Sequence, residues 1–206
     1  MIIYREDMTL AEKMTLEQFE NQLKELMEEL FGSCSEYKGV FRSVPEHLGV
    51  MDASVIFETA LETGLSPDIP YPIIHFHTTL AQKIDDSIVP GILEGLNELN
   101  TMVSAGAFPS FGCFGYYAPL KQIFLSYRLP LSIDALDAEL DNVRFYLGSL
   151  YEQLDVFADY ILFLCDDPNR MTLKDYMEYL DSIADLNNLE ARIEYLEKRL
   201  GITDQD

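Results

Sequence analysis

Two histidines one residue apart, His75 and His77, are the residues whose types and spacing most directly suggest chemistry. They lie in the segment IIHFHTTLAQKIDD, which ends in Asp85 and Asp86. Imidazole and carboxylate groups are common metal ligands, and a His-x-His pair opens several kinds of catalytic metal site. Such sites need a further histidine, and the chain offers only His47, upstream in a segment typical of a turn. The sequence favours two histidines on one face of a strand over a metal centre, and we expect no cofactor.

The cysteines are a second candidate for catalysis. Cys34, Cys113 and Cys165 are odd in number and widely spaced, which argues against a disulfide framework and a thiolate zinc site. Cys113 needs a nearby base to act as a nucleophile, and His75 or His77 is that base only if the two strands are adjacent. Neither Gly-x-Ser-x-Gly nor Gly-x-x-x-x-Gly-Lys occurs. We expect no enzyme; a small metal- or thiol-dependent enzyme using His75 and His77 stays an alternative.

The charge of the chain narrows the classes of partner. Its 206 residues include 14 basic and 36 acidic side chains, a formal net charge of −22, and residues 134–206 alone hold 6 basic and 18 acidic ones. Such a field repels phosphate backbones and anionic lipid, so we expect neither nucleic-acid nor membrane binding. The sequence shows no signal peptide and no apolar run long enough to span a bilayer, which predicts a cytoplasmic protein.

Hydrophobic periodicity assigns the chain to elements. A capping box of Thr15 and Gln18 predicts the start of a first helix, and Gly32 predicts its end. Alternation and turn residues predict three strands, then a helix, then a β-hairpin that turns near Ala118–Leu120. The residue ranges are, in chain order, 36–43, 52–62 and 71–81 for the strands, 86–106 for the helix and 108–132 for the hairpin.

From Ser132 onward the chain is predicted to be helical. Apolar residues from Leu136 to Leu164 step alternately by four and three, an unbroken heptad pattern. One straight helix over this stretch would be about 45–50 Å long, so we expect it to bend or to pack part of its apolar stripe on another chain. Thr172 with Asp175 predicts a further helix, and a last one follows at 189–200.

This order of elements predicts an α+β fold. We expect an antiparallel sheet with helices on one face in the order α-βββ-α-ββ-α, within residues 1–165, and a helical C-terminal extension over residues 166–206.

Around the hairpin the chain is rich in aromatic residues, and alternation directs about half of them to the helices and half to the opposite face with His75 and His77. The residues of this candidate partner-binding surface are His75, His77, Phe111, Phe114, Tyr116, Tyr117, Phe124 and Tyr127. The tail helices or a second copy are the alternative cover for these rings, and the surplus of apolar faces predicts a homodimer.

The segment ILEGLNELN, the hairpin closed by YRLPLS, and the long amphipathic helix with Asp155 resemble the YbjN-like and type III secretion chaperone-like family. The resemblance covers about residues 15–165 and leaves out 166–206. It implies a small acidic protein, often dimeric and without an active site, that binds other proteins along apolar patches and sheet edges.

Three functions are therefore weighed. The first is an intracellular protein-binding module, chaperone-like or regulatory, whose partner is unknown. The second is an immunity or antitoxin protein whose acidic surface complements a basic toxin. The third is the small metal- or thiol-dependent enzyme described above.

Overall fold

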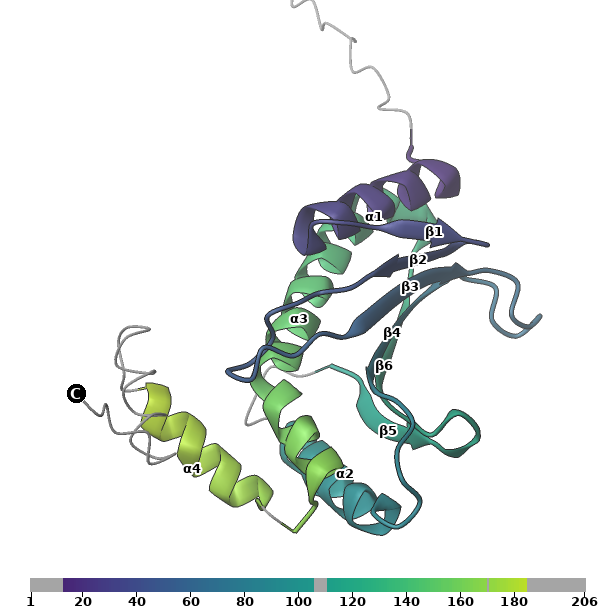
Figure 1. Ribbon diagram of the computed structural model, residues 1–206. Coiled ribbons are helices and arrows are strands. Elements are labelled where there is room, and N and C mark those ends of the chain that lie inside the picture. Colours follow the sequence, from purple (N-terminus) through teal and green to yellow (C-terminus); the bar gives the residue numbers. More distant parts are fainter. Residues whose placement is uncertain (1–12, 106–110, 170, 185–206) are drawn as a thin grey trace, which may run out of the picture.

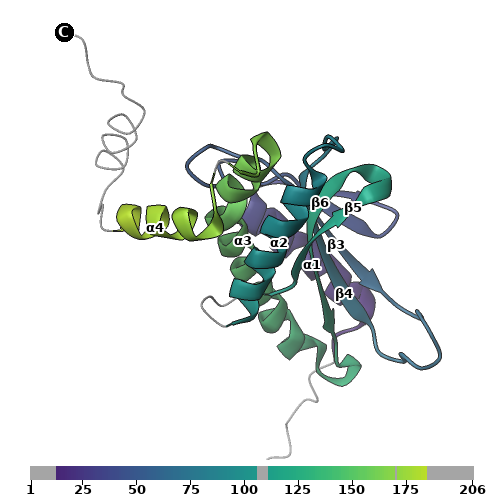
Figure 2. The same ribbon diagram turned by 90° about the horizontal axis from the view of Figure 1, so that it is seen from below.

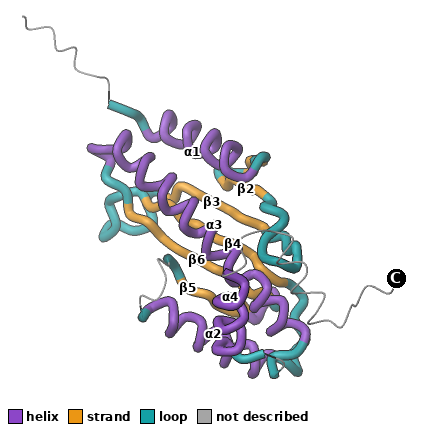
Figure 3. Tube along the Cα trace, turned by 90° about the vertical axis from the view of Figure 1, so that its left-hand side faces the viewer, coloured by secondary structure: helices purple, strands orange, loops and turns teal. Residues whose placement is uncertain are grey.

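A computed structural model describes residues 13–105, 111–169 and 171–184, and they form a six-stranded antiparallel sheet with helices on one face (Figures 1 and 3). The predicted α+β class is confirmed. The strand order across the sheet is β1-β2-β3-β4-β6-β5, and every neighbouring pair is antiparallel. The elements are α1 (Leu16–Phe31), β1 (Ser35–Tyr37), β2 (Val40–Ser43), β3 (Ile56–Glu62), β4 (Ile73–Ala81), α2 (Val89–Ser104), β5 (Cys113–Tyr117), β6 (Gln122–Pro130), α3 (Leu136–Asp166) and α4 (Leu173–Ala184).

The first predicted strand, 36–43, is in fact a hairpin of two short strands. Lys38 and Gly39 both have positive φ, 53° and 75°, and they form the two-residue turn between β1 and β2. Two successive residues of positive φ match the right-handed twist of a tight hairpin. The alternation of apolar and polar residues continues through this turn, so it concealed the reversal of the chain.

The helix signals read from the sequence are confirmed. The Gln18 N–H donates to Thr15 Oγ1 at 3.2 Å, and the Thr15 N–H donates to Gln18 Oε1 at 2.8 Å. Gly32 closes α1 with a φ of 76°. At the other end of the chain, the Asp175 N–H donates to Thr172 Oγ1 at 3.2 Å, which begins α4. The helix predicted at 189–200 lies outside the described residues.

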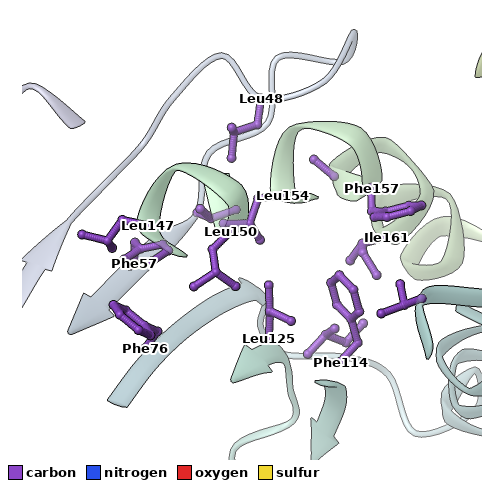
Figure 4. Packing of buried hydrophobic residues seen from close by; sticks show 14 of the residues in the cluster. Leu48, Phe57, Phe76, Phe114, Leu125, Leu147, Leu150, Leu154, Phe157 and Ile161 are labelled. Carbon is purple, nitrogen blue, oxygen red and sulfur yellow. The ribbon is translucent and has the colours of Figure 1, made fainter. Parts of the chain in front are cut away.

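The apolar stripe of α3 forms the centre of the core. The helix has 31 residues, and the heptad positions of its middle are buried. Figure 4 shows Leu150 and Leu154 above Leu125 of β6, with Phe57 and Phe76 of the neighbouring strands beside Leu147. The sheet, α1 and α2 of the same chain cover this stripe. The stripe is therefore buried without a second chain.

Helix α4 packs on the side of α3 and α2 that faces away from the sheet (Figure 2). Tyr176 is fully buried, its ring centroid lies 5.4 Å from that of Tyr160, and its hydroxyl donates to the carbonyl oxygen of Val156. Burial raises the pKa of Tyr176, and the nearby carboxylate of Asp159 raises it further, so this phenol stays protonated. None of the described helices is long and apolar enough to cross a membrane.

The loop between β2 and β3 is held against α3 by a buried carboxylate. Asp159 is only 2% exposed, and it accepts hydrogen bonds from the N–H groups of Val50 at 2.8 Å and Met51 at 3.0 Å. The Gly49 N–H donates to Asp155 Oδ1 at 2.8 Å. Gly49 has a φ of 68°, and a Cβ there would lie 2.4 Å from Asp159 Oδ1, so only glycine fits at this approach.

We expect Asp159→Asn to lower the free energy of unfolding by about 2 kcal/mol, because one buried N–H would then face an amide NH₂ in place of a carboxylate oxygen. Urea unfolding followed by circular dichroism measures the change. Asp141→Asn changes an exposed carboxylate about five turns upstream on α3. It serves as the control and is expected to stay within about 0.5 kcal/mol. Equal stability of the two variants would contradict the role given to Asp159.

Candidate functional site

The sheet face opposite the helices is the candidate functional site. Figure 1 shows α1, α2 and α3 on one side of the sheet, and no described helix lies over the other side. We call this side the open face. Its principal side chains come from five strands and are Arg42, Glu58, Glu62, His75, His77, Cys113, Tyr117, Phe124, Ser126 and Arg128.

His75 lies at the centre of a polar network on the open face. Its Nδ1 is 3.2 Å from Glu62 Oε1 on β3, and its Nε2 is 2.9 Å from Ser126 Oγ on β6. The side chains of His75 and Glu62 are 23% and 22% exposed. Three neighbouring strands thus each contribute one member of a carboxylate, imidazole and hydroxyl series.

The charged groups of the open face pair with one another. Arg42 donates to Glu58 Oε1 from Nε at 2.9 Å and from Nη2 at 2.5 Å, and Arg128 Nε lies 3.6 Å from Glu62 Oε2. Two arginines therefore balance two glutamates on these strands. Since the whole chain carries a net charge of −22, its negative surplus lies elsewhere, and the open face is locally neutral.

The second histidine packs on an aromatic ring. The rings of His77 and Phe124 are stacked with centroids 5.3 Å apart, and those of His75 and His77 lie 5.9 Å apart. Phe124 also covers Gly115, its partner on β5, where an added Cβ would lie 2.6 Å from the Phe124 ring. Burial lowers the pKa of His77, and electrostatic repulsion from the neighbouring His75 lowers it further. His77 is accordingly a neutral, apolar-packed member of the face at physiological pH.

The predicted aromatic surface is divided between the two faces of the sheet. Phe114 is buried, with its ring 6.2 Å from Phe157 of α3, so it is not accessible to a partner. Tyr127 stacks with Phe76, and Phe111 contacts Tyr146 of α3, so both belong to the helix side.

Tyr116 also lies on the helix side of the sheet, where it is partly buried and packed against the core. Among the predicted aromatic residues only Tyr117 and Phe124 lie on the open face, together with His75 and His77. The structure therefore unites four of the eight predicted residues and separates the other four from them.

The geometry proposed for a thiol site is not present. Strand β6 lies between β4 and β5, so Cys113 is not on a strand adjacent to His75 and His77. It is Ser126 that is directly paired with both Cys113 and His77.

The carboxylates that follow the histidine strand do not join it either. Asp85 Oδ1 accepts hydrogen bonds from the N–H and hydroxyl of Ser87 at 2.8 and 2.6 Å, and Asp86 Oδ2 lies 2.7 Å from Lys121 Nζ. They precede α2, whose N-cap, Ile88, has no capping side chain. Within residues 13–105, 111–169 and 171–184, no group of three or more His, Cys, Asp or Glu side chains is placed to hold a metal ion.

The β5 edge of the sheet is partly occupied by a side chain. Asn100 of α2 donates from Nδ2 to the Phe114 carbonyl at 2.8 Å and accepts from the Phe114 N–H at 2.9 Å. An asparagine amide here takes the place of a neighbouring strand, which protects the edge from pairing with another chain. Contact through the open face is therefore favoured over strand addition at Phe114.

Sequence reasoning missed Glu62, Ser126 and Arg128 as members of the site. The available signal was the alternation of side chains along the predicted strand, which places Ser126 and Arg128 on the same face of it. The sequence did not show that this strand pairs with β4, which is what brings Ser126 to His75.

A comparison with models of known protein families, with curated proteins and with solved structures finds no match for this chain.

The two histidine environments predict opposite responses to acid. His77 has a lowered pKa in the folded state, so its contribution to stability is complete above about pH 6.5 and declines as the pH falls below that value. When the pH is lowered from about 7.5 to about 5, we expect the free energy of unfolding to fall less in His77→Gln than in the unmodified chain. Urea unfolding at the two pH values measures this difference.

His47 is the matched control. Its hydrogen bond with Asp52, at 2.5 Å, raises its pKa, so its contribution is present below about pH 6.5 and is lost as the pH rises through the raised value. His47→Gln is expected to lose more stability on acidification than the unmodified chain. The same sign of change in both variants would contradict this interpretation.

Proposed function

We propose that the protein is a binding module that receives an extended segment of a partner protein on its open face. The observation that carries the proposal is a sheet face over which no described helix lies, with aromatic and imidazole rings and internally paired charges. The centre of a protein interface is typically rich in aromatic side chains and poor in unpaired charges, as this face is. A chaperone-like or regulatory role inside the cell fits a module that holds a segment in this way.

The chemistry of the face indicates the chemistry of the segment. Tyr117 is 49% exposed, and the Phe124 ring lies over Gly115, so they offer ring surface to apolar or aromatic side chains. Arg42 hydrogen-bonds Glu58, and Arg128 lies within ion-pair distance of Glu62, so positive and negative charges balance on the face and it does not select a strongly charged partner. An extended segment with apolar residues at alternate positions suits such a surface.

A basic partner is the second candidate, because the helical side of the described residues carries several exposed carboxylates. Glu17, Glu20, Glu25 and Glu28 of α1 and Asp137 of α3 are among its carboxylates. An immunity or antitoxin protein would bind a basic toxin through this side. The two candidates use opposite faces of the molecule and respond differently to salt.

Selection of peptides from a random display library on the immobilised chain tests the first candidate. We expect selected peptides to bind at least about tenfold more weakly to Phe124→Ala and to Tyr117→Ala, since one central ring contributes more than about 1 kcal/mol. Phe145→Ala, which removes a 60% exposed aromatic side chain from α3, is the control and keeps full affinity. Peptides whose affinity is reduced by Phe145→Ala alone would contradict binding on the open face.

The salt dependence of binding separates the two candidates. Between about 50 mM and about 500 mM salt the affinity of an open-face peptide is expected to change little, because the charges there are paired internally. A basic toxin bound to the acidic helices would lose affinity steeply over the same range. Isothermal titration calorimetry at both salt concentrations measures the change.

The homodimer expected from the sequence stays a prediction. The stripe of α3 is buried within the chain, so among the described residues a second copy would contact another surface, such as the open face or the exposed ring of Phe145. Light scattering at micromolar concentration distinguishes a dimer from a monomer. A dimer that dissociates in Phe124→Ala would identify the second copy itself as an occupant of the open face.

A further inference from the structure

We propose that Ser126 is a nucleophile activated by His75 and Glu62, and that the open face carries an acyl-transfer site for small carboxylic esters with an apolar acyl group. This inference does not rest on peptide binding. It rests on the order in which β3, β4 and β6 lie side by side and on the two hydrogen bonds that join their side chains.

The connectivity of the three side chains is the one that serine activation requires. The carboxylate of Glu62 contacts Nδ1 of His75, and the hydroxyl of Ser126 contacts Nε2 of the same ring. An ionised carboxylate only accepts hydrogen bonds, so it holds the imidazole proton on Nδ1. Nε2 is then the acceptor and Ser126 the donor, which aligns the hydroxyl proton with the base that removes it.

The carboxylate is held in place from its other side as well. Glu62 Oε2 is buried without a hydrogen bond, and Arg128 Nε lies 3.6 Å from it. The guanidinium of Arg128 attracts the Glu62 carboxylate and helps to hold it beside His75 Nδ1. Glu62 therefore acts through His75 and is a positioning residue.

The surroundings of Ser126 provide places for both parts of an ester. Phe124 and Arg128 flank Ser126 on the same face of β6, two residues away in each direction. The Phe124 ring offers apolar surface to the acyl group. The guanidinium of Arg128 offers positive charge to the oxyanion, and a side chain must do so because the ladder hydrogen bonds occupy the backbone N–H groups of this strand.

The reaction balances without a cofactor. Ser126 Oγ forms a bond to the ester carbonyl carbon while its proton moves to His75 Nε2, and the bond from that carbon to the alcohol oxygen then breaks. The alkoxide takes the proton from His75 Nε2 and leaves as the alcohol. Water repeats the sequence on acyl-Ser126, which releases the carboxylic acid and restores the hydroxyl. The site is open to water and relies on one side-chain donor, so we expect slow turnover.

Labelling of the intact chain with an alkyl fluorophosphonate tests the proposal. Ser126 Oγ attacks phosphorus and fluoride leaves with the serine proton, which leaves a stable phosphonate ester. Trypsin then releases the labelled site as QIFLSYR, residues 122–128, which contains one serine. Tandem mass spectrometry distinguishes an adduct on Ser126 from one on Tyr127.

We expect Ser126→Ala to abolish the adduct and His75→Gln to slow labelling by about 100-fold or more, the usual contribution of a general base. The controls are Ser35→Ala, a strand serine whose hydroxyl donates to the carbonyl of Arg42, and His47→Gln, a histidine whose Nδ1 pairs with Asp52. Both controls keep the labelling rate of the unmodified chain. Hydrolysis of p-nitrophenyl acetate is expected to follow the same order of variants.

Glu62→Gln separates positioning from a merely structural role. Its amide can donate to Nδ1, which moves the ring proton to Nε2 and removes the acceptor for Ser126. We expect ¹⁵N NMR of His75 to show this change of tautomer, together with a loss of labelling and an unchanged circular dichroism spectrum. The unmodified chain is expected to show the proton on Nδ1.

Three results would overturn the proposal. The first is an unmodified chain labelled no faster at Ser126 than His75→Gln, and the second is an adduct confined to Tyr127. The third is a folded unmodified chain that shows no adduct at all. None of these results bears on peptide affinity, so peptide binding and serine reactivity succeed or fail separately.

Discussion

The packing of the α3 stripe against one face of the sheet is the contact on which the rest of the structure depends. A sheet of six strands has two faces, and the apolar residues of α1, α2 and α3 gather on one of them around Leu150 and Phe157. Burial of large aliphatic and aromatic side chains is the main favourable contribution to folding. Alternation along each strand then directs every second side chain to the other face. The open face is a direct consequence of this one-sided core.

The same constraint explains how the open face is composed. Polar side chains in mid-sheet lose part of their hydration and must find partners, because an unpaired buried polar group is costly. Arg42 with Glu58, and His75 with Glu62 and Ser126, meet that requirement across neighbouring strands. Pairing stabilises the sheet, and in the second set it also brings a hydroxyl within hydrogen-bond distance of an imidazole. The contacts that meet the structural requirement are thus the ones on which the proposed reactivity of Ser126 rests.

The comparison of sequence and structure separates local from non-local information. The capping box at Thr15, the turn at Ala118–Leu120 and the stripe of α3 were predictable because each depends on residues close together in the chain. The reversal at Lys38 and Gly39 was not predicted, since alternation runs through it without a break. The expectation of no enzyme rested on the absence of short motifs, and it stays a prediction. Glu62, His75 and Ser126 form no short motif, because they are separated by 13 and 51 residues.

By itself the sequence determined the α+β class, the helix boundaries near their caps, and which residues of each strand share a face, because periodicity and capping are properties of neighbouring residues. Only the tertiary structure decided that β6 lies between β4 and β5. That order separates Cys113 from the histidines, divides the predicted aromatic surface, and sets Ser126 against His75. Strand pairing joins residues far apart in the chain, and its register follows from the whole core being packed at once.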